Sequence, residues 1–285
     1  MQLRVRTVDL IEVKIMKIAL FQMNIVWEDK QKNYSEGERA ICHASHQGVE
    51  LILFPEMSFT GFSMNIAETQ EKDGQTVRFI CQMAQTYQIA IGFGWVKYCG
   101  EKAENHYTIV DEKGIVLSDY VKIHPFSYAG ETKYFNSGKD IYCFSWKNHT
   151  WCSFICYDLR FPEIFQYASE CADVIIVPAN WPKKREDHWR TLLKARAIEN
   201  QSYILGINCV GRIGEVDYSG CTSAYSPDGN LIEEMYGKSG FIYVDLEDKA
   251  SDERDKFPVK ADRKWKFYKE LYKKHGVRYQ ESNSE

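Results

Sequence analysis

From residue 16 to residue 246 the chain alternates short apolar runs with segments of helical periodicity, and this alternation constrains its fold more than any other feature. Short apolar runs rich in Val, Ile, Phe and Tyr predict strands, whereas apolar positions three or four residues apart predict helices. The predicted strands are residues 17–23, 49–54, 89–96, 105–110, 115–122, 141–146, 150–155, 173–178, 203–208, 220–225, 231–236 and 240–246. The predicted helices are residues 30–46, 75–87, 162–170 and 184–200.

Tight turns, instead of helices, join some of the neighbouring predicted strands. Residues 111–114 separate one such pair, and residues 227–230 separate another. Hairpins mixed into a β-α alternation imply mixed sheets rather than purely parallel ones. No linker rich in Gly, Ser or Pro interrupts the pattern. We therefore predict one α/β domain over residues 16–270, with an N-terminal extension at 1–15 and a C-terminal tail at 271–285.

Charge and cysteine content limit the partners and the compartment. The 285 residues carry a formal net charge of -4 at pH 7, so we expect no nucleic-acid partner. The chain has no apolar signal segment and no run of about 18 apolar residues, so we expect no membrane association. Its nine cysteines include no C-x-x-C pair, which fits neither a zinc site nor a disulfide framework. We expect a reduced, cytoplasmic protein without a metal ion, which starts at Met1 or at Met16.

Cys156 is the candidate nucleophile. It lies where the apolar run 150–155 meets a polar segment that contains Pro162. A helix that begins near Phe161 would place its positive N-terminal end beside the sulfur, so we expect the pKa of the thiol to be lowered. Cysteine is also among the residue types most often buried, and a lone cysteine fits a place in the core better. Two other polar residues, described next, favour the role of Cys156 as a nucleophile over a place in the core.

Glu56 and Lys122 also stand at the ends of predicted strands. Glu56 follows the run 49–54, and Lys122 closes the strand 115–122. Ligands bind at the carboxyl ends of strands in open α/β sheets, although a lone charge there more often reaches solvent. A thiol, a carboxylate and an ammonium group together form the minimum set for acyl transfer. The sequence therefore predicts an acyl-transfer site.

Three segments around these residues resemble the signature blocks of the nitrilase superfamily, the carbon–nitrogen hydrolases. Their order and separation match those of the family, and the resemblance extends over about residues 16–268. It implies a four-layer α-β-β-α sandwich with mixed sheets and a Glu–Lys–Cys triad at one end of the sheets. The segments are Phe54-Pro55-Glu56, Tyr120-Val121-Lys122-Ile123-His124 and Cys156-Tyr157-Asp158-Leu159-Arg160-Phe161-Pro162-Glu163.

The resemblance also implies chemical roles. Glu56 takes the thiol proton as Cys156 attacks an amide carbonyl, and later returns it to the departing ammonia. Lys122 and the backbone N–H of Tyr157 stabilise the oxyanion. Glu131 stands at the place of a fourth acidic residue that orients Lys122 and Glu56, although a loop carboxylate in water is the alternative. No metal or organic cofactor is required.

The residues after the nucleophile favour amides over nitriles, because nitrile-cleaving members usually carry Trp where this chain has Tyr157. This segment is most similar to the ω-amidase and deaminated-glutathione-amidase branch, which cleaves small carboxylate-bearing amides such as 2-oxoglutaramate and 2-oxosuccinamate. Such a substrate needs a cationic anchor. Arg160 is the candidate anchor, and a salt bridge to Asp158 or Glu163 is its equally weighted alternative. Tyr157 is a further candidate for substrate binding, and the candidate pocket walls, each also compatible with plain core, are Phe62, Phe126 and Trp181.

Three functional hypotheses remain open at this stage. The first is hydrolysis of a small carboxylate-bearing amide, and the second is hydrolysis of an N-carbamoyl amide or another aliphatic amide. The third is a non-catalytic ligand-binding protein with the same fold, which the cost of grouping three polar side chains in one cleft disfavours. The resemblance also implies a homodimer that assembles through the helices after the nucleophile and through the aromatic-rich C-terminal segment.

Overall fold

The structure is a computed structural model that describes residues 15–247 and 249–273, so the predicted extension, apart from residue 15, and most of the predicted tail lie outside the described residues. The strands are β1 (Met16–Gln22), β2 (Leu51–Leu53), β3 (Ala90–Cys99), β4 (Lys102–Val110), β5 (Val116–Val121), β6 (Phe144–Trp146), β7 (His149–Ser153), β8 (Val174–Ala179), β9 (Tyr203–Asn208), β10 (Val210–Ile213), β11 (Val216–Tyr225), β12 (Leu231–Tyr236) and β13 (Gly240–Leu246). The α-helices are α1 (Lys30–His46), α2 (Ile66–Thr69), α3 (Gln75–Tyr87), α4 (Glu131–Tyr134), α5 (Pro162–Ala168), α6 (Glu186–Asn200), α7 (Lys249–Lys256) and α8 (Trp265–Lys273). The 3-10 helices are η1 (Ser127–Ala129), η2 (Cys156–Arg160), η3 (Lys183–Arg185) and η4 (Val259–Asp262).

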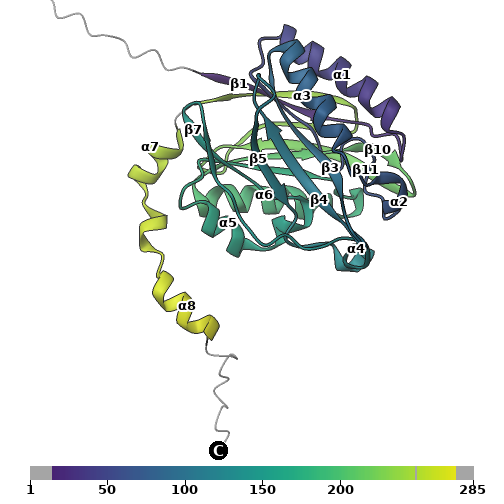
Figure 1. The fold of residues 1–285 in the computed structure, drawn as a ribbon. Coiled ribbons are helices and arrows are strands. Elements are labelled where there is room, and N and C mark those ends of the chain that lie inside the picture. Colours follow the sequence, from purple (N-terminus) through teal and green to yellow (C-terminus); the bar gives the residue numbers. More distant parts are fainter. Residues whose placement is uncertain (1–14, 248, 274–285) are drawn as a thin grey trace, which may run out of the picture.

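Two mixed sheets pack face to face between two layers of helices (Figure 1). The first sheet has six strands in the order β13-β1-β2-β3-β4-β5, and α1 and α3 cover its outer face. The second sheet has the path β10-β11-β9-β8-β7-β6, with β12 paired to β11, and α5 and α6 cover its outer face. The predicted four-layer α-β-β-α sandwich is therefore confirmed.

Strand β1 shows why the strands are apolar at successive positions and not only at alternate ones. Ile18 and Leu20 belong to the core cluster that also contains residues of the second sheet. Ala19 and Phe21, which point to the opposite face, pack in the cluster that contains residues of α1 and α3. Because both faces of this sheet are covered, both sets of side chains must be apolar.

Strand direction decides which strand ends meet. β1, β2 and β3 are parallel to one another, whereas β4 is antiparallel to both β3 and β5. Strand β5 therefore runs in the same direction as β2. The C-terminal ends of both strands lie on the same side of the first sheet, where its strands end. In the second sheet β7, β8 and β9 are likewise parallel.

Several predicted boundaries differ from the structure. The predicted strand 150–155 ends at Ser153, and the helix predicted over 184–200 begins with the separate turn η3 before α6. The hairpin of β10 and β11 was not predicted, because Gly211 and Gly214 interrupt its apolar pattern. No helix of the described residues combines the length and the apolar character needed to cross a bilayer.

Cys143, directly before β6, and Cys171, after α5, are joined as a disulfide with their Cα atoms 6.9 Å apart. The expectation of a fully reduced protein is therefore wrong for this pair. The two cysteines are 28 residues apart in the sequence, and only the packing of α5 beside β6 and β7 brings them together, which no local pattern reveals. The other seven cysteines are free.

Candidate active site

Glu56, Lys122 and Glu131 meet at one edge of the first sheet, and their exposed fractions are 0%, 1% and 0%. Lys122 directly follows β5, and Glu56 lies three residues after the parallel strand β2, so both come from the same edge. Glu131 opens the short helix α4. The backbone after β2 can approach β3 because position 94 is glycine, where an added Cβ would lie 2.3 Å from the backbone nitrogen of Met57.

The ammonium group of Lys122 lies between the two carboxylates. Its Nζ is 2.8 Å from Oε1 of Glu56 and 3.1 and 2.9 Å from the two oxygens of Glu131. Asn105 on β4 binds both acids as well, since its Nδ2 donates to Oε1 of Glu56 at 2.8 Å and to Oε1 of Glu131 at 3.2 Å. We call Glu56, Asn105, Lys122 and Glu131 the buried cluster.

Backbone N–H groups also bind the two carboxylates. The backbone N–H of Asn180, directly after β8, donates to Oε2 of Glu56 at 2.9 Å, and its side-chain amide donates to the carbonyl of Glu56 at 2.6 Å. The backbone N–H of Phe126 donates to Oε2 of Glu131. The strand-end criterion that singled out Glu56 would also have found Asn180, whereas Asn105 gives no comparable signal in the sequence.

Charge balance explains the protonation of Lys122. Burial acts to lower the pKa of this ammonium group, but the negative charges of Glu131 and Glu56 outweigh it and raise the pKa above its ordinary value. Burial also raises the pKa of Glu131, an effect that Lys122 opposes. The charged form of Lys122 is therefore favoured, as the stabilisation of an oxyanion requires.

Cys156 is positioned by Asp158, which the sequence had not assigned to the site. Cys156 opens η2 with a φ of 49°, in the left-handed region that is costly for a residue with a Cβ. The buried carboxylate of Asp158 accepts hydrogen bonds from the backbone N–H of Ile155 at 2.9 Å and from the hydroxyl of Tyr120 at 2.8 Å. Its Oδ1 accepts from the backbone N–H of His124 at 2.9 Å. Asp158 thus ties the turn of the nucleophile to the end of β5.

The predicted lowering of the thiol pKa is wrong. Burial raises the pKa of Cys156 well above its ordinary value, the charge of Glu56 raises it further, and Lys122 only partly opposes them. The helix α5 begins only at Pro162, after the five residues of η2 that Cys156 itself opens. The raised pKa favours the thiol over the thiolate, so its activation calls for a base.

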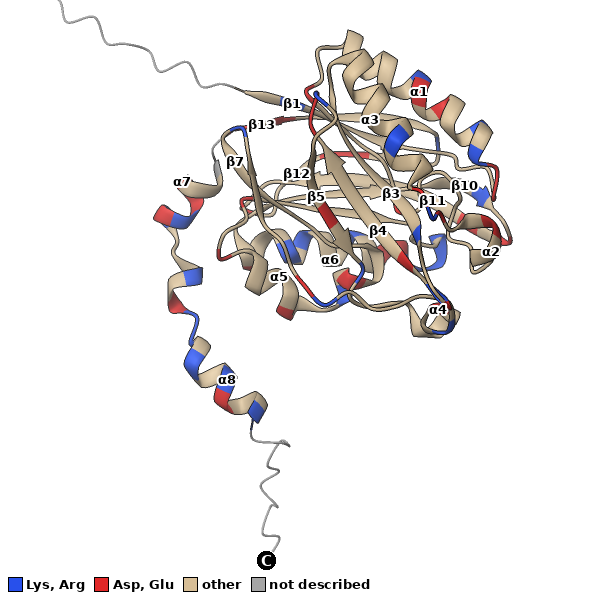
Figure 2. Cartoon of the chain, viewed as in Figure 1, with Lys and Arg blue, Asp and Glu red and all other residues tan. Residues whose placement is uncertain are grey.

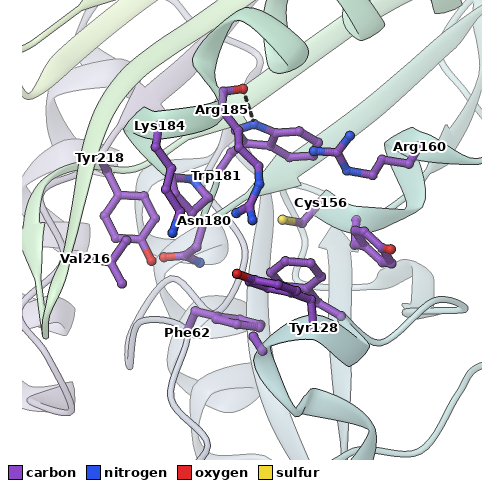
Figure 3. A pocket seen from close by; sticks show the side chains of 14 residues that line it. Phe62, Tyr128, Cys156, Arg160, Asn180, Trp181, Lys184, Arg185, Val216 and Tyr218 are labelled. Carbon is purple, nitrogen blue, oxygen red and sulfur yellow. Dashed lines mark hydrogen bonds between the residues drawn. The ribbon is translucent and has the colours of Figure 1, made fainter.

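Cys156 lines a cavity of about 180 Å³, and six of the fourteen residues that line it are aromatic (Figure 3). All the predicted substrate-binding residues line it, namely Phe62, Phe126, Tyr157, Arg160 and Trp181. The sequence had not pointed to Tyr128, Asn180, Lys184, Arg185 and Tyr218, which also line it. No Asp or Glu is among the lining residues, so the three cations in the wall have no acidic neighbour there.

Arg160 does not form the salt bridge that was its alternative. Its guanidinium lies 4.7 Å from the ring centroid of Trp181 and 3.3 Å from Nδ1 of His188. Within residues 15–247 and 249–273 it makes no ion pair with a carboxylate, and Asp158 is occupied by other donors. The described side chains also contain no group of three or more His, Cys, Asp or Glu residues that could hold a metal ion.

Comparison with known proteins agrees with this geometry. Residues 17–252 match the family model of carbon-nitrogen hydrolases. Omega-amidase YafV of Yersinia enterocolitica is 35% identical over 196 residues, covering 69% of this chain and 75% of that protein. The 2-oxoglutaramate amidase of Bacillus subtilis (strain 168) is 30% identical, covering 85% of this chain and 95% of that protein.

A solved amidase from Nesterenkonia AN1, of the nitrilase superfamily, has a TM-score of 0.82 to this structure at 26% sequence identity, covering 90% of this chain and 97% of its own. Fold and site thus define a hydrolase with a mixed α/β sandwich. The chain belongs to the carbon-nitrogen hydrolase family, and the relatives and the solved structure named above are amidases.

Proposed function

We propose that this protein hydrolyses small amides that also carry a carboxylate, of the ω-amidase type, to the acid and ammonia through a thioester on Cys156. Substrates of the 2-oxoglutaramate and 2-oxosuccinamate kind fit this class. One observation carries the proposal: the thiol of Cys156, which has Glu56, Lys122 and Glu131 of the buried cluster as electrostatic neighbours, lines a small cavity together with three cations that have no acidic partner there.

The first half-reaction breaks the C–N bond. The sulfur of Cys156 attacks the amide carbonyl while Glu56 accepts the thiol proton, which the raised pKa of the thiol makes necessary. The negative charge that develops on the carbonyl oxygen is stabilised by Lys122 and by the backbone N–H of Tyr157. Glu56 then gives its proton to the departing nitrogen, so that ammonia leaves and a thioester remains.

The second half-reaction breaks the C–S bond. Glu56 removes a proton from a water molecule as the water attacks the thioester carbonyl, and the same donors stabilise the second oxyanion. Collapse of this intermediate releases the carboxylic acid, and the sulfur takes the proton back from Glu56. The sum is one amide and one water converted to one acid and one ammonia.

The names of the relatives support the substrate class. Two of them are an omega-amidase and a 2-oxoglutaramate amidase. A mutant of the Nesterenkonia amidase shows covalent addition of the acetamide moiety of fluoroacetamide at its active site cysteine. The cationic wall of this cavity supplies what a carboxylate-bearing substrate requires, because guanidinium groups bind carboxylates in a bidentate manner.

Ammonia release from a panel of ω-amides, N-carbamoyl amino acids and nitriles tests the proposal. We expect the highest kcat/KM for dicarboxylate monoamides, and its loss by at least about 10³-fold in Cys156→Ala. Cys81→Ala, at a free cysteine outside the cavity, is the control and should retain activity. Trapping with hydroxylamine should yield the hydroxamate of the acyl group. Equal turnover in Cys156→Ala would overturn the mechanism, and carbon dioxide release from carbamoyl substrates would favour the alternative.

We further propose a homodimer, for which the exposed apolar side chains of α8 are the support. Trp265, Phe267, Leu271 and Tyr272 are exposed by 39%, 56%, 52% and 73%, on a helix that extends away from the sandwich (Figure 1). A second copy of the chain would cover this face. Light scattering should give twice the chain mass for the full protein and a lower mass after truncation at residue 263, whereas a monomeric full chain would contradict the proposal.

A further inference from the structure

Three cations line the cavity, and their mutual repulsion calls for an anion. Arg160, Lys184 and Arg185 form no ion pair with an acid in the part of the chain that the structure describes. Burial lowers the pKa of the Arg160 guanidinium, and the positive charge of Arg185 lowers it further, so the two groups repel each other. A ligand with a negative charge would relieve this repulsion, as the substrate class proposed above provides.

The two arginines differ in how far their donors are already engaged. The guanidinium of Arg160 lies against the ring of Trp181 and bonds to the ring nitrogen of His188. The guanidinium of Arg185 is 5.7 Å from the ring centroid of Phe126 and 5.2 Å from that of Tyr128, and it donates no hydrogen bond to another described residue. Its planar set of donors is therefore available to a ligand.

The backbone of Arg185 is held firmly while its side chain enters the cavity. The indole Nε1 of Trp181 donates to the carbonyl of Arg185 at 2.7 Å, and the N–H of Arg185 donates to the carbonyl of Pro182 at 3.0 Å. Figure 3 shows the side chain extending from η3 into the cavity on the side of Cys156. A fixed backbone and two flanking rings reduce the entropy that the guanidinium loses when it binds.

Local helix stability does not account for an arginine at this position. Arg185 is the N-cap residue of α6, where Ser, Thr, Asp and Asn stabilise a helix because their oxygens bind the first free N–H groups. Arginine has no acceptor, and its side chain makes no capping hydrogen bond. The side chain is therefore not engaged in capping α6, and its donors can bind a ligand in the cavity.

We propose that Arg185 binds the carboxylate of the substrate in a bidentate manner and so determines the preference for carboxylate-bearing amides. This assignment rests on the proposed function, and it places the anchor on η3 instead of at Arg160. Arg160 then forms part of the wall through its contact with Trp181. The amide end of the substrate faces Cys156, and its carboxylate end faces the first turn before α6.

A matched pair of substrates tests the assignment. Succinamate and butyramide carry the same amide, but succinamate ends in a carboxylate where butyramide ends in a methyl group. In Arg185→Gln we expect kcat/KM for succinamate to fall about 100-fold, mainly through KM, because charged hydrogen bonds are lost. The value for butyramide should stay within about threefold. Arg185→Lys keeps the positive charge but not the planar pair of donors. Its kcat/KM for succinamate should fall about tenfold.

Lys183→Gln is the control, because it removes one positive charge from the same turn at a residue outside the cavity lining. Its kcat/KM for both amides should stay within about threefold of the parent protein. A parallel loss of both substrates in Arg185→Gln would overturn the assignment. So would a selective loss of succinamate in Arg160→Gln but not in Arg185→Gln.

Binding provides a readout that is independent of turnover. In the Cys156→Ala background, calorimetric titration with succinamate should show an affinity about 100-fold lower when Arg185→Gln is added. If the parent protein hydrolyses butyramide as well as succinamate, the proposed function fails. If the parent protein prefers succinamate and Arg185→Gln retains both this preference and the affinity, only the role of Arg185 fails.

Discussion

The buried cluster and the C-terminal segment (residues 249–273) both depend on cations that bind oxygen atoms, but solvent reaches only the second. Lys122 and its two acids are at most 1% exposed. In the C-terminal segment, Arg254 bonds to Asp173 and to the carbonyl of Ala172, and its side chain is 22% exposed. Figure 2 shows basic and acidic residues interspersed along α7 and α8.

This difference in burial determines what each network contributes. A buried charge that loses its partner leaves the other charge without solvation, at a cost of several kcal/mol. A charge near the surface is resolvated when its partner is removed, so the loss is small. We therefore expect the buried cluster to be both catalytic and critical for stability, and the C-terminal segment to be attached weakly and to tolerate substitution.

The largest expected effect is that of Lys122→Met. Two buried carboxylates would then face each other without a cation, so the free energy of unfolding should fall by about 3–5 kcal/mol, and turnover should be lost. Urea unfolding and ammonia release measure the two effects. Arg254→Met, the matched removal of a cation from the C-terminal segment, should cost no more than about 1–2 kcal/mol and leave kcat/KM unchanged. Equal costs for the two variants would invalidate the comparison.

Glu56→Gln should separate the reactivity of the thiol from turnover. Hydrolysis should fall by about 10²–10⁴-fold because the base is lost. The same change removes a negative charge that raises the pKa of Cys156, so the thiolate should form at lower pH. Labelling of Cys156 by iodoacetamide, followed by mass spectrometry across pH, should show a midpoint below that of the parent protein. A midpoint at higher pH would contradict the electrostatic assignment.

Asn105→Ala should have a smaller effect, since the carboxylates keep Lys122. We expect the loss of about 2 kcal/mol of stability, because the variant removes donors from two buried carboxylates, and a fall in kcat of about tenfold. Asn65→Ala is the exposed control, in which an amide that donates to Glu28 at 3.2 Å is removed. In Asn65→Ala the free energy of unfolding should fall by less than about 0.5 kcal/mol. Similar costs for both asparagines would show that burial is not the deciding factor.

The smallest effect concerns pH and Lys260, which bonds to the carbonyl of Ser169 at the end of α5. Burial, together with the charges of Arg254 and Arg263, lowers its pKa to about 8, although Glu170 and Asp173 oppose this. Because the neutral form is favoured in the attached segment, attachment should weaken as pH falls from the ordinary pKa of 10.5 toward about 8, and should change little at lower pH.

Hydrogen exchange of the amides in α7 and η4, corrected for the intrinsic effect of pH, measures this attachment. Protection should rise between pH 7 and pH 9.5 in the parent protein. Lys260→Met should abolish this rise without changing kcat/KM. A variant that keeps the pH dependence would assign it to another group.

Local pattern was sufficient to predict the mixed sheets and the three central residues of the site, whereas the four layers followed from the family resemblance. Apolar periodicity depends only on neighbours in the sequence, so the mixed sheets could be inferred, although the hairpin interrupted by Gly211 and Gly214 could not. Glu56 and Lys122 were recognisable because each polar residue ends an apolar run. Cys156 was recognisable by the same criterion, but its pKa was not, since burial and the charge of Glu56 arise only after folding.

The sequence by itself therefore determined the type of fold and the chemical groups at its strand ends. Only the tertiary structure decided which distant residues partner them, because pairings such as Asn105 with Glu131, or Cys143 with Cys171, depend on the packing of separate elements. Arg185 illustrates the limit most clearly. In the sequence it belongs to a basic turn typical of a solvated surface, and only the positions of Trp181 and Phe126 direct its charge into the cavity.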